Sequence, residues 1–227
     1  MSEQKITNIV MIGIGGQGAL TMMEMLALAA EIAEREVHVL SRVSLARLGG
    51  VGLCHVRLGP CSSSAIPVGE ADILLTLEMS EVLRALPMAR PGAWAFVNCY
   101  RRLPIAAGVA GTRYPTQIEI EHALASQGIH SLFVPEQLPE TFYVDEQVGI
   151  SPTVEIPERA ASAPSGKEEQ IGRVNMSMLG VLCGFTELLP RPVLEEAIAL
   201  RMPQLAQPSI QTFAAGWRFA QEVRAAL

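Results

Sequence analysis

The sequence predicts a Rossmann-like α/β three-layer sandwich, in which a mostly parallel sheet lies between layers of helices, with further helices at the C-terminus. Short apolar runs rich in β-branched residues alternate with stretches of helix formers along the first 134 residues, the order expected of βαβ units. The first run leads directly into a glycine-rich segment at 13–18. The 227 residues, 49% of them hydrophobic, can bury one large core, so we expect a single domain over residues 1–227.

The opening segment, Ile6 to Glu34, predicts a buried strand, a tight turn and a helix. Ile9 to Ile12 is a continuous apolar run, and Ala19 to Ala33 contains strong helix formers without Pro or Gly. The glycines between them allow a sharp turn and let backbone N–H groups approach an anion. A tight turn without any ligand remains an alternative, because the G-x-G-x-x-G pattern alone is a weak signal. The ligand-binding residues that the pattern predicts are Gly13, Gly15, Gly16, Gln17 and Gly18.

Further apolar runs predict the rest of the sheet and its helices. Helices are expected over Ser80–Met88 and from Thr116 to about Gln127, where Thr116 and Glu119 have the spacing of a capping box. Pro91-Gly92 predicts a turn before a strand. The expected strands after the first are Glu36–Leu40, Val51–Leu58, Ala71–Leu77, Ala93–Val97 and Ile129–Val134.

The segment from about residue 135 to 170 interrupts this alternation. It is rich in Pro, Glu, Ala and Ser, and we expect a mobile insertion there. Beyond it, helices are expected over Val174–Glu187, from Pro192 onward, and along a final apolar stripe. Phe213 and Trp217, together with small residues around Gly180, are expected to offer apolar surface to a partner. The stripe consists of Ile210, Phe213, Trp217, Ala220 and Val223.

Composition argues against several classes of function. A net charge of −6 and an aromatic content of 5% disfavour binding to nucleic acid or to an anionic membrane surface. The N-terminal apolar stretch is interrupted by polar residues, so we expect neither a secretory signal nor a transmembrane segment. The cysteines lack C-x-x-C spacing, which predicts reduced thiols in a cytoplasmic protein and no metal site on this chain. They are Cys54, Cys61, Cys99 and Cys183.

Arginines follow several of the expected strands. Arg42 and Arg47 come after the second strand, and Arg101 comes after the strand at 93–97. Because such loops meet at the carboxyl edge of an open parallel sheet, we expect these arginines to bind an anionic ligand together with the glycine turn, residues 13–18. Arg57 lies within an apolar strand and is expected to pair with a carboxylate or to face a partner. The common hydrolase, P-loop and zinc-protease motifs are absent from the sequence, so it predicts binding rather than chemistry of its own.

A series of motifs continues beyond the first strand and its glycine turn. Gly49-Gly50 is followed after four residues by His55-Val56-Arg57. The later landmarks are Ala71–Leu75, Pro91–Asn98, Tyr114-Pro115, Asn175–Gly180 and Phe213–Gly216. In this order the motifs resemble the gamma-type domain of the 2-oxoacid:ferredoxin oxidoreductases, and within that family the small (beta) subunit for indolepyruvate. One departure is that Leu48 stands where the family has an Arg, with Arg47 one position earlier.

The resemblance implies a subunit of a complex that converts a 2-oxoacid and coenzyme A into an acyl-CoA, CO2 and reduced ferredoxin. Thiamine diphosphate and [4Fe-4S] clusters would be carried by a large partner subunit, whereas this chain would carry no cofactor and would help to form the coenzyme A region. The isolated chain would be inactive and could form a homo-oligomer. Its partners would be the large subunit and, through the complex, ferredoxin, and Arg57 and Asn175 would be interface or structural residues.

Two other classes of function stay open at this point. A free-standing NADP-dependent reductase is supported by the glycine pattern and by Ser41-Arg42, which stands where an NAD-binding fold would carry an acidic residue. A non-catalytic scaffolding subunit with the same fold is the other alternative.

Overall fold

Six strands form one mixed sheet in the order β2-β3-β1-β4-β5-β6. The computed structural model describes residues 6–43, 50–102, 113–136, 138 and 167–227, so Arg47 and most of the expected insertion lie outside the described residues. β1, β4, β5 and β6 are parallel, whereas β3 runs antiparallel between β1 and β2. The strands are β1 (Thr7–Ile14), β2 (Val37–Val43), β3 (Val51–Leu58), β4 (Ala71–Thr76), β5 (Ala89–Asn98) and β6 (His130–Val134).

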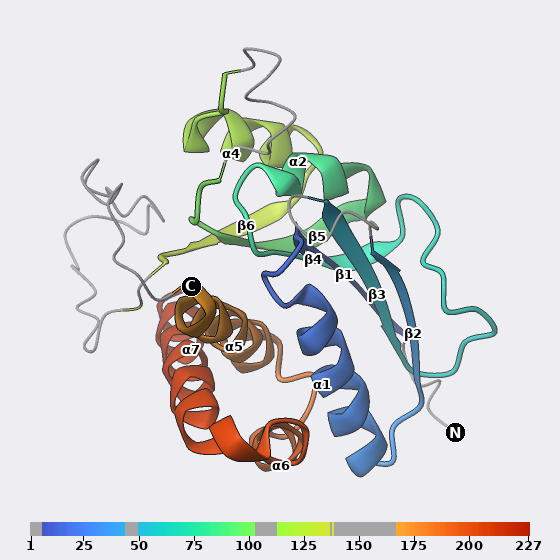
Figure 1. Ribbon diagram of the computed structural model, residues 1–227. Coiled ribbons are helices and arrows are strands. Elements are labelled where there is room, and N and C mark those ends of the chain that lie inside the picture. Colours follow the sequence, from blue (N-terminus) through green and yellow to red (C-terminus); the bar gives the residue numbers. More distant parts are fainter. Residues whose placement is uncertain (1–5, 44–49, 103–112, 137, 139–166) are drawn as a thin grey trace.

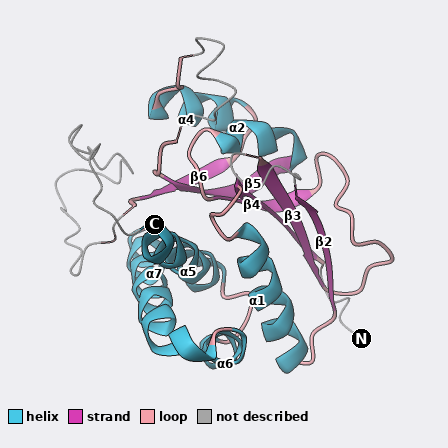
Figure 2. Ribbon diagram, viewed as in Figure 1, coloured by secondary structure: helices cyan, strands magenta, loops and turns pink. Residues whose placement is uncertain are grey.

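Helices cover both faces of the sheet, which confirms the predicted α/β sandwich (Figures 1 and 2). One face carries α1 (Ala19–Ile32), α5 (Lys167–Thr186), α6 (Arg191–Arg201) and α7 (Ala206–Ala226). The other face carries α2 (Glu81–Ala85) and α4 (Gln117–Ser126). Short 3-10 turns follow α2 at Leu86–Met88 and precede α7 at Pro203–Leu205. None of the helices in these described ranges is both long and apolar enough to cross a membrane.

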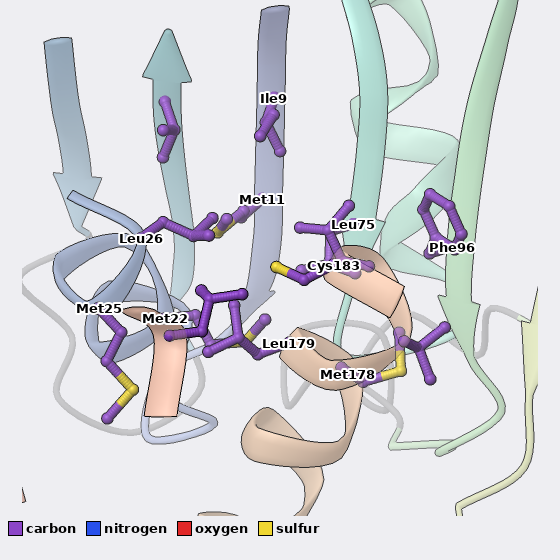
Figure 3. Close-up of a cluster of buried hydrophobic side chains, with 14 of the residues drawn as sticks. Ile9, Met11, Met22, Met25, Leu26, Leu75, Phe96, Met178, Leu179 and Cys183 are labelled. Atoms are coloured by element: carbon purple, nitrogen blue, oxygen red, sulfur yellow. The ribbon is translucent and has the colours of Figure 1, made fainter. Parts of the chain in front are cut away.

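The larger hydrophobic core lies between the sheet and the layer formed by α1 and α5 (Figure 3). Flexible methionine side chains contribute strongly to it and fill irregular gaps between the layers. Each fully buried side chain of this kind stabilises the fold by about 1.5–3 kcal/mol relative to its exposure to water. Residues at the centre of this core include Ile9, Met11, Met22, Leu26, Leu75, Phe96, Leu179 and Cys183.

Helices α5 and α7 pack with their backbones in contact, through glycines. A Cβ atom added to Gly180 would lie 2.0 Å from the carbonyl oxygen of Phe213, and one added to Gly216 would lie 2.0 Å from that of Ser177. Phe213 is completely buried, and Trp217 packs against the same core. The prediction that Phe213 and the Gly180 region offer apolar surface to a partner is therefore wrong, because α5 and α7 bury these residues against each other. Trp217 is only partly buried, and its exposure to a partner stays a prediction.

Element boundaries differ from the prediction most at α5 and β5. α5 begins at Lys167, although the composition of this stretch resembles that of the preceding insertion. β5 begins at Ala89, before the predicted turn at Pro91-Gly92, and its register against β4 shifts between Ala71 and Ile73. The capping box at the start of α4 is confirmed: the Thr116 side chain accepts from the N–H of Glu119, and the Glu119 side chain accepts from the N–H of Thr116.

Candidate functional site

The carboxyl edge of the parallel strands gathers the glycine turn and the loops that follow β4 and β5. Strand register places Ile12, Thr76 and Val97 in one row across β1, β4 and β5. The chain leaves this row through Gly15–Gly18 after β1, Leu77–Ser80 after β4 and Cys99–Arg102 after β5. Ligands in open α/β sheets bind at this edge, where successive connections leave toward opposite faces, as α1 and α2 do here (Figure 1).

The glycine turn has the backbone geometry that its sequence requires. Gly16 and Gly18 have φ angles of +94° and +88°, which side chains with a Cβ adopt only with strain. The N–H of Gly15 donates to the carbonyl of Gly50 at 2.7 Å, and the N–H of Gln17 donates to the carbonyl of Ile14 at 3.0 Å. These two N–H groups are therefore used inside the turn, and Gly16 projects into open space with no atom within 4 Å of an added Cβ.

Gln17 holds the turn together from the inside. Its side chain is 7% exposed, its Oε1 accepts from the N–H of Ile14 at 2.7 Å, and its Nε2 donates to the carbonyl of Leu77 at 3.1 Å. A Cβ added to Gly13 would lie 3.1 Å from the same Oε1. Gln17 and Gly13, which the sequence predicts as ligand-binding residues, thus contribute by shaping the turn and tying β1 to the loop after β4.

The N-terminus of α1 is the electropositive part of the site. α1 starts after Gly18, and within the described chain it has no side-chain cap and no acidic residue in its first turn, so no carboxylate of that turn offsets the helix dipole or accepts from its first N–H groups. Asn175 of α5 lies against this end, since a Cβ on Gly18 would meet its Nδ2 at 2.2 Å. Asn175 is 5% exposed, and its buried Oδ1 has no hydrogen-bond partner among the residues that the structure describes. A buried amide with an unused polar atom therefore borders the helix end.

The structure brings only some of the predicted ligand-binding arginines to the carboxyl edge of the parallel strands. Arg101 and its neighbour Arg102 are exposed on the loop after β5. Arg42 is exposed near the end of β2, where β3 separates it from β1, so about 10 Å lies between the two strand axes. In a dinucleotide-binding fold the second strand adjoins the first. This insertion of β3 removes the main support for an NADP-dependent reductase.

Arg57 lies at the opposite edge of the sheet and has neutral partners. Its Nε donates to Oδ1 of Asn8 at 2.9 Å, and its Nη1 donates to the carbonyls of Ser63 and Ala65 at 2.9 and 3.2 Å. The prediction that Arg57 pairs with a carboxylate is wrong within the described residues. Arg57 instead anchors the loop after β3 to the start of β1, which is a structural role.

Glu78 is a residue of this edge that the sequence reasoning missed. It follows β4, is completely buried, and accepts hydrogen bonds from four donors. One of them is the hydroxyl of Tyr114, whose pKa is raised by burial and by this contact with Glu78. An acidic residue placed directly after an apolar strand was the available signal. Among the described residues, no group of three or more His, Cys, Asp or Glu side chains could hold a metal ion.

Comparison with known proteins gives related sequences. The family model for pyruvate ferredoxin/flavodoxin oxidoreductase matches residues 8–219. Indolepyruvate oxidoreductase subunit IorB of Archaeoglobus fulgidus is 34% identical over 113 residues, which cover 50% of this chain and 56% of that protein. The subunit of the same name from Pyrococcus horikoshii is 32% identical over 126 residues, which cover 53% of this chain and 60% of that protein. The matched region thus spans little more than half the length of these relatives.

Solved structures share the fold at low sequence identity. The gamma subunit of a keto/oxoacid ferredoxin oxidoreductase from Geobacter sulfurreducens aligns over 95% of this chain and 99% of its own, with a TM-score of 0.58 and 15% identity. A 2-oxoglutarate:ferredoxin oxidoreductase from Magnetococcus marinus covers 99% of this chain with 32% of its own, with a TM-score of 0.61 and 16% identity. The family match extends over nearly the whole sequence, and the chain therefore belongs to the pyruvate ferredoxin/flavodoxin oxidoreductase family.

Proposed function

We propose that this chain is the small subunit of a cytoplasmic 2-oxoacid:ferredoxin oxidoreductase and that its carboxyl edge forms part of the coenzyme A site. The complex oxidatively decarboxylates a 2-oxoacid, of which an aryl 2-oxoacid such as indolepyruvate is the best candidate. A large partner subunit carries thiamine diphosphate and the iron–sulfur clusters and passes electrons to ferredoxin. This chain contributes binding and no cofactor of its own.

The observation that carries the proposal is the open, uncompensated N-terminus of α1. Its glycine turn leaves Gly16 facing open space, no acidic side chain occupies the first turn, and the buried Asn175 amide borders it. Such a helix end attracts phosphate groups through its N–H donors and its dipole. The phosphates of coenzyme A carry the negative charge that the N-terminus of α1 would bind.

Two comparisons support the choice of ligand and substrate. The curated relatives are named as indolepyruvate oxidoreductase subunits, and the Magnetococcus marinus oxidoreductase was solved with 2-oxoglutarate, coenzyme A and succinyl-CoA bound. Since 32% of that chain has the fold of this one, a domain with this fold can belong to an enzyme that binds coenzyme A.

A single charge at the first turn of α1 tests the proposal. Leu20 is the second residue of α1 and is 39% exposed, so Leu20→Glu can be compared with the uncharged Leu20→Gln. An added carboxylate interacts favourably with the helix end by about 0.3–1 kcal/mol, so the Glu variant should be at least as stable to heat. It should nevertheless bind coenzyme A more weakly by about 1–2 kcal/mol, or about 5- to 30-fold in Kd, because it repels the phosphates.

The measurements are calorimetric titration of coenzyme A into the assembled complex and thermal unfolding of each variant. Ile118 occupies the equivalent second position of α4 and is 61% exposed, so Ile118→Glu and Ile118→Gln form a matched control pair. This pair should show equal affinities for coenzyme A. Equal affinities in the Leu20 pair as well, with both proteins folded, would show that α1 does not face the ligand and would refute the proposed site.

A further inference from the structure

We propose that Glu78 is a positioning residue, which holds Arg101 and Arg102 in place to meet the phosphate-bearing end of coenzyme A. The inference rests on the proposed function and adds a second group of ligand-binding residues to the site. This group, the arginine arm, is Arg101 and Arg102, and it lies on the other side of β4 from the glycine turn. Glu78 itself does not contact the ligand, because its carboxylate is completely buried. It acts through the backbone of the loop that carries the two arginines.

The carboxylate of Glu78 is saturated by donors from three segments of the chain. Its Oε2 accepts from the hydroxyl of Ser80 at 2.6 Å and from the N–H of Glu81 at 3.1 Å. Its Oε1 accepts from the N–H of Arg102 at 3.1 Å and from the hydroxyl of Tyr114. Four donors on two oxygens are the arrangement that an ionised carboxylate requires, and they compensate the cost of burying its charge.

These contacts extend the pairing of β4 and β5 beyond the ends of the two strands. The N–H of Met79 donates to the carbonyl of Tyr100 at 2.9 Å, so residues 78–79 and 100–102 are joined twice, once through the Met79 backbone and once through the Glu78 side chain. Tyr100 also donates its N–H to Oδ1 of Asn98 at 3.4 Å. The backbone of residues 100–102 is therefore held by residues 78–79 and by Asn98, while the side chains of Arg101 and Arg102 remain exposed.

A fixed loop matters for binding because long arginine side chains lose conformational freedom when they contact a ligand. Holding their backbone in the bound position lowers this cost, and guanidinium groups suit the geometry of phosphate. The placement of the Glu78 carboxylate between two exposed arginines and the glycine turn points to preorganisation of the site.

Two hydroxyl deletions remove different donors to Glu78. Tyr114→Phe removes a donor to Oε1, the oxygen that holds Arg102, and with it the acceptor of the Ser80 N–H. Ser80→Ala removes only a donor to Oε2, the oxygen that faces α2, and leaves the Ser80 N–H bonded to Tyr114. In the assembled complex, Tyr114→Phe should raise the Kd for coenzyme A about fivefold or more and flatten its dependence on salt. Ser80→Ala should leave both quantities close to those of the unmodified protein.

Glu78→Gln extends the test and Arg101→Gln completes a double-mutant cycle. Hydrogen exchange of the Arg102 amide in the full chain should accelerate in Glu78→Gln, and combining Glu78→Gln with Arg101→Gln should weaken binding little more than either change alone. If exchange accelerates while coenzyme A affinity stays unchanged, the positioning role is refuted. Strictly additive losses in the double variant would refute it as well.

Failure of the inference is distinguishable from failure of the proposed function. If Leu20→Glu weakens coenzyme A binding but Arg101→Gln and Arg102→Gln do not, the site stands and the arginine arm is overturned. If the arginine variants weaken binding but Tyr114→Phe and Glu78→Gln do not, the arginines bind without help from Glu78. If neither Leu20→Glu nor the arginine variants affect coenzyme A, the proposed function itself fails.

Discussion

Replacing Gly180 with alanine should destabilise the protein, although alanine is the better helix former. Gly→Ala in the middle of a helix contributes about 0.5–1 kcal/mol of stability where space permits. Here the new Cβ would lie 2.0 Å from the carbonyl oxygen of Phe213, and contacts below 3.0 Å essentially never occur. α5 and α7 must therefore move apart by about 1 Å at this crossing, the difference between these two distances.

Overpacking of this kind costs about 1–3 kcal/mol, and a clash with backbone rather than with a flexible side chain lies at the upper end. After subtraction of the helix-propensity gain, we expect a net loss of about 2 kcal/mol, or about 4–8 °C in Tm for a domain of this size. Chemical denaturation with an unchanged m-value would show that the change acts on stability rather than on the extent of unfolding.

Neighbouring glycines provide a graded control for this prediction. Gly216→Ala should cost about as much, because its Cβ would lie 2.0 Å from the carbonyl oxygen of Ser177. Gly184→Ala should cost less, because its nearest contact is 2.8 Å from the carbonyl oxygen of Trp217. A Tm for Gly180→Ala equal to or above that of the parent protein would refute the close backbone packing of α5 and α7.

Two further predictions concern buried titratable groups. Burial, with smaller effects of Arg42 and Arg57, lowers the pKa of His55, so the unfolded chain binds more protons and stability should fall as pH drops below about 6.5. His55→Asn, which can keep an acceptor for the backbone, should flatten this dependence in denaturation curves between about pH 5 and 7, and an unchanged slope would contradict the assignment. Burial also raises the pKa of Cys54 and of Cys99 to about 11. Burial raises the pKa of the fourth cysteine, Cys183, as well, so only Cys61 should react rapidly with a thiol reagent in the native protein. Rapid labelling of a second cysteine, located by peptide mass spectrometry, would show that the core opens.

Local sequence signals predicted most elements, because each depends on few neighbouring residues. The apolar run at Ile9–Ile12 with its glycines, and the capping box of Thr116, need only local chemistry. The antiparallel insertion of β3 between β1 and β2 was not predictable in this way, since alternation identifies a strand but not its neighbours. That one pairing decides whether Arg42 can reach the glycine turn.

The sequence was sufficient to propose where the candidate site lies, but not which side chains contact one another within it. Glycines at positive φ are readable from sequence, whereas the donors that surround Glu78 come from residues as far away as Tyr114, 36 positions along the chain. Gln17 resembles a ligand-binding residue in sequence, but its contact with the carbonyl of Leu77 exists only once the fold brings Leu77 beside it. Asn175 reaches the start of α1 from α5, a helix that begins at Lys167, far along the chain, so its role depends on tertiary packing.

The most direct test of the central claim is the KM for coenzyme A of the assembled oxidoreductase containing Leu20→Glu, relative to the complex containing Leu20→Gln. Ferredoxin reduction is followed at fixed saturating 2-oxoacid, and the KM for the 2-oxoacid is measured in the same preparations. If α1 faces the phosphates, the KM for coenzyme A should rise about fivefold or more at low salt and the difference should shrink as salt is added, while the KM for the 2-oxoacid stays the same. A ratio of one for coenzyme A at low salt, with both complexes active, would contradict the assignment of this edge to the coenzyme A site.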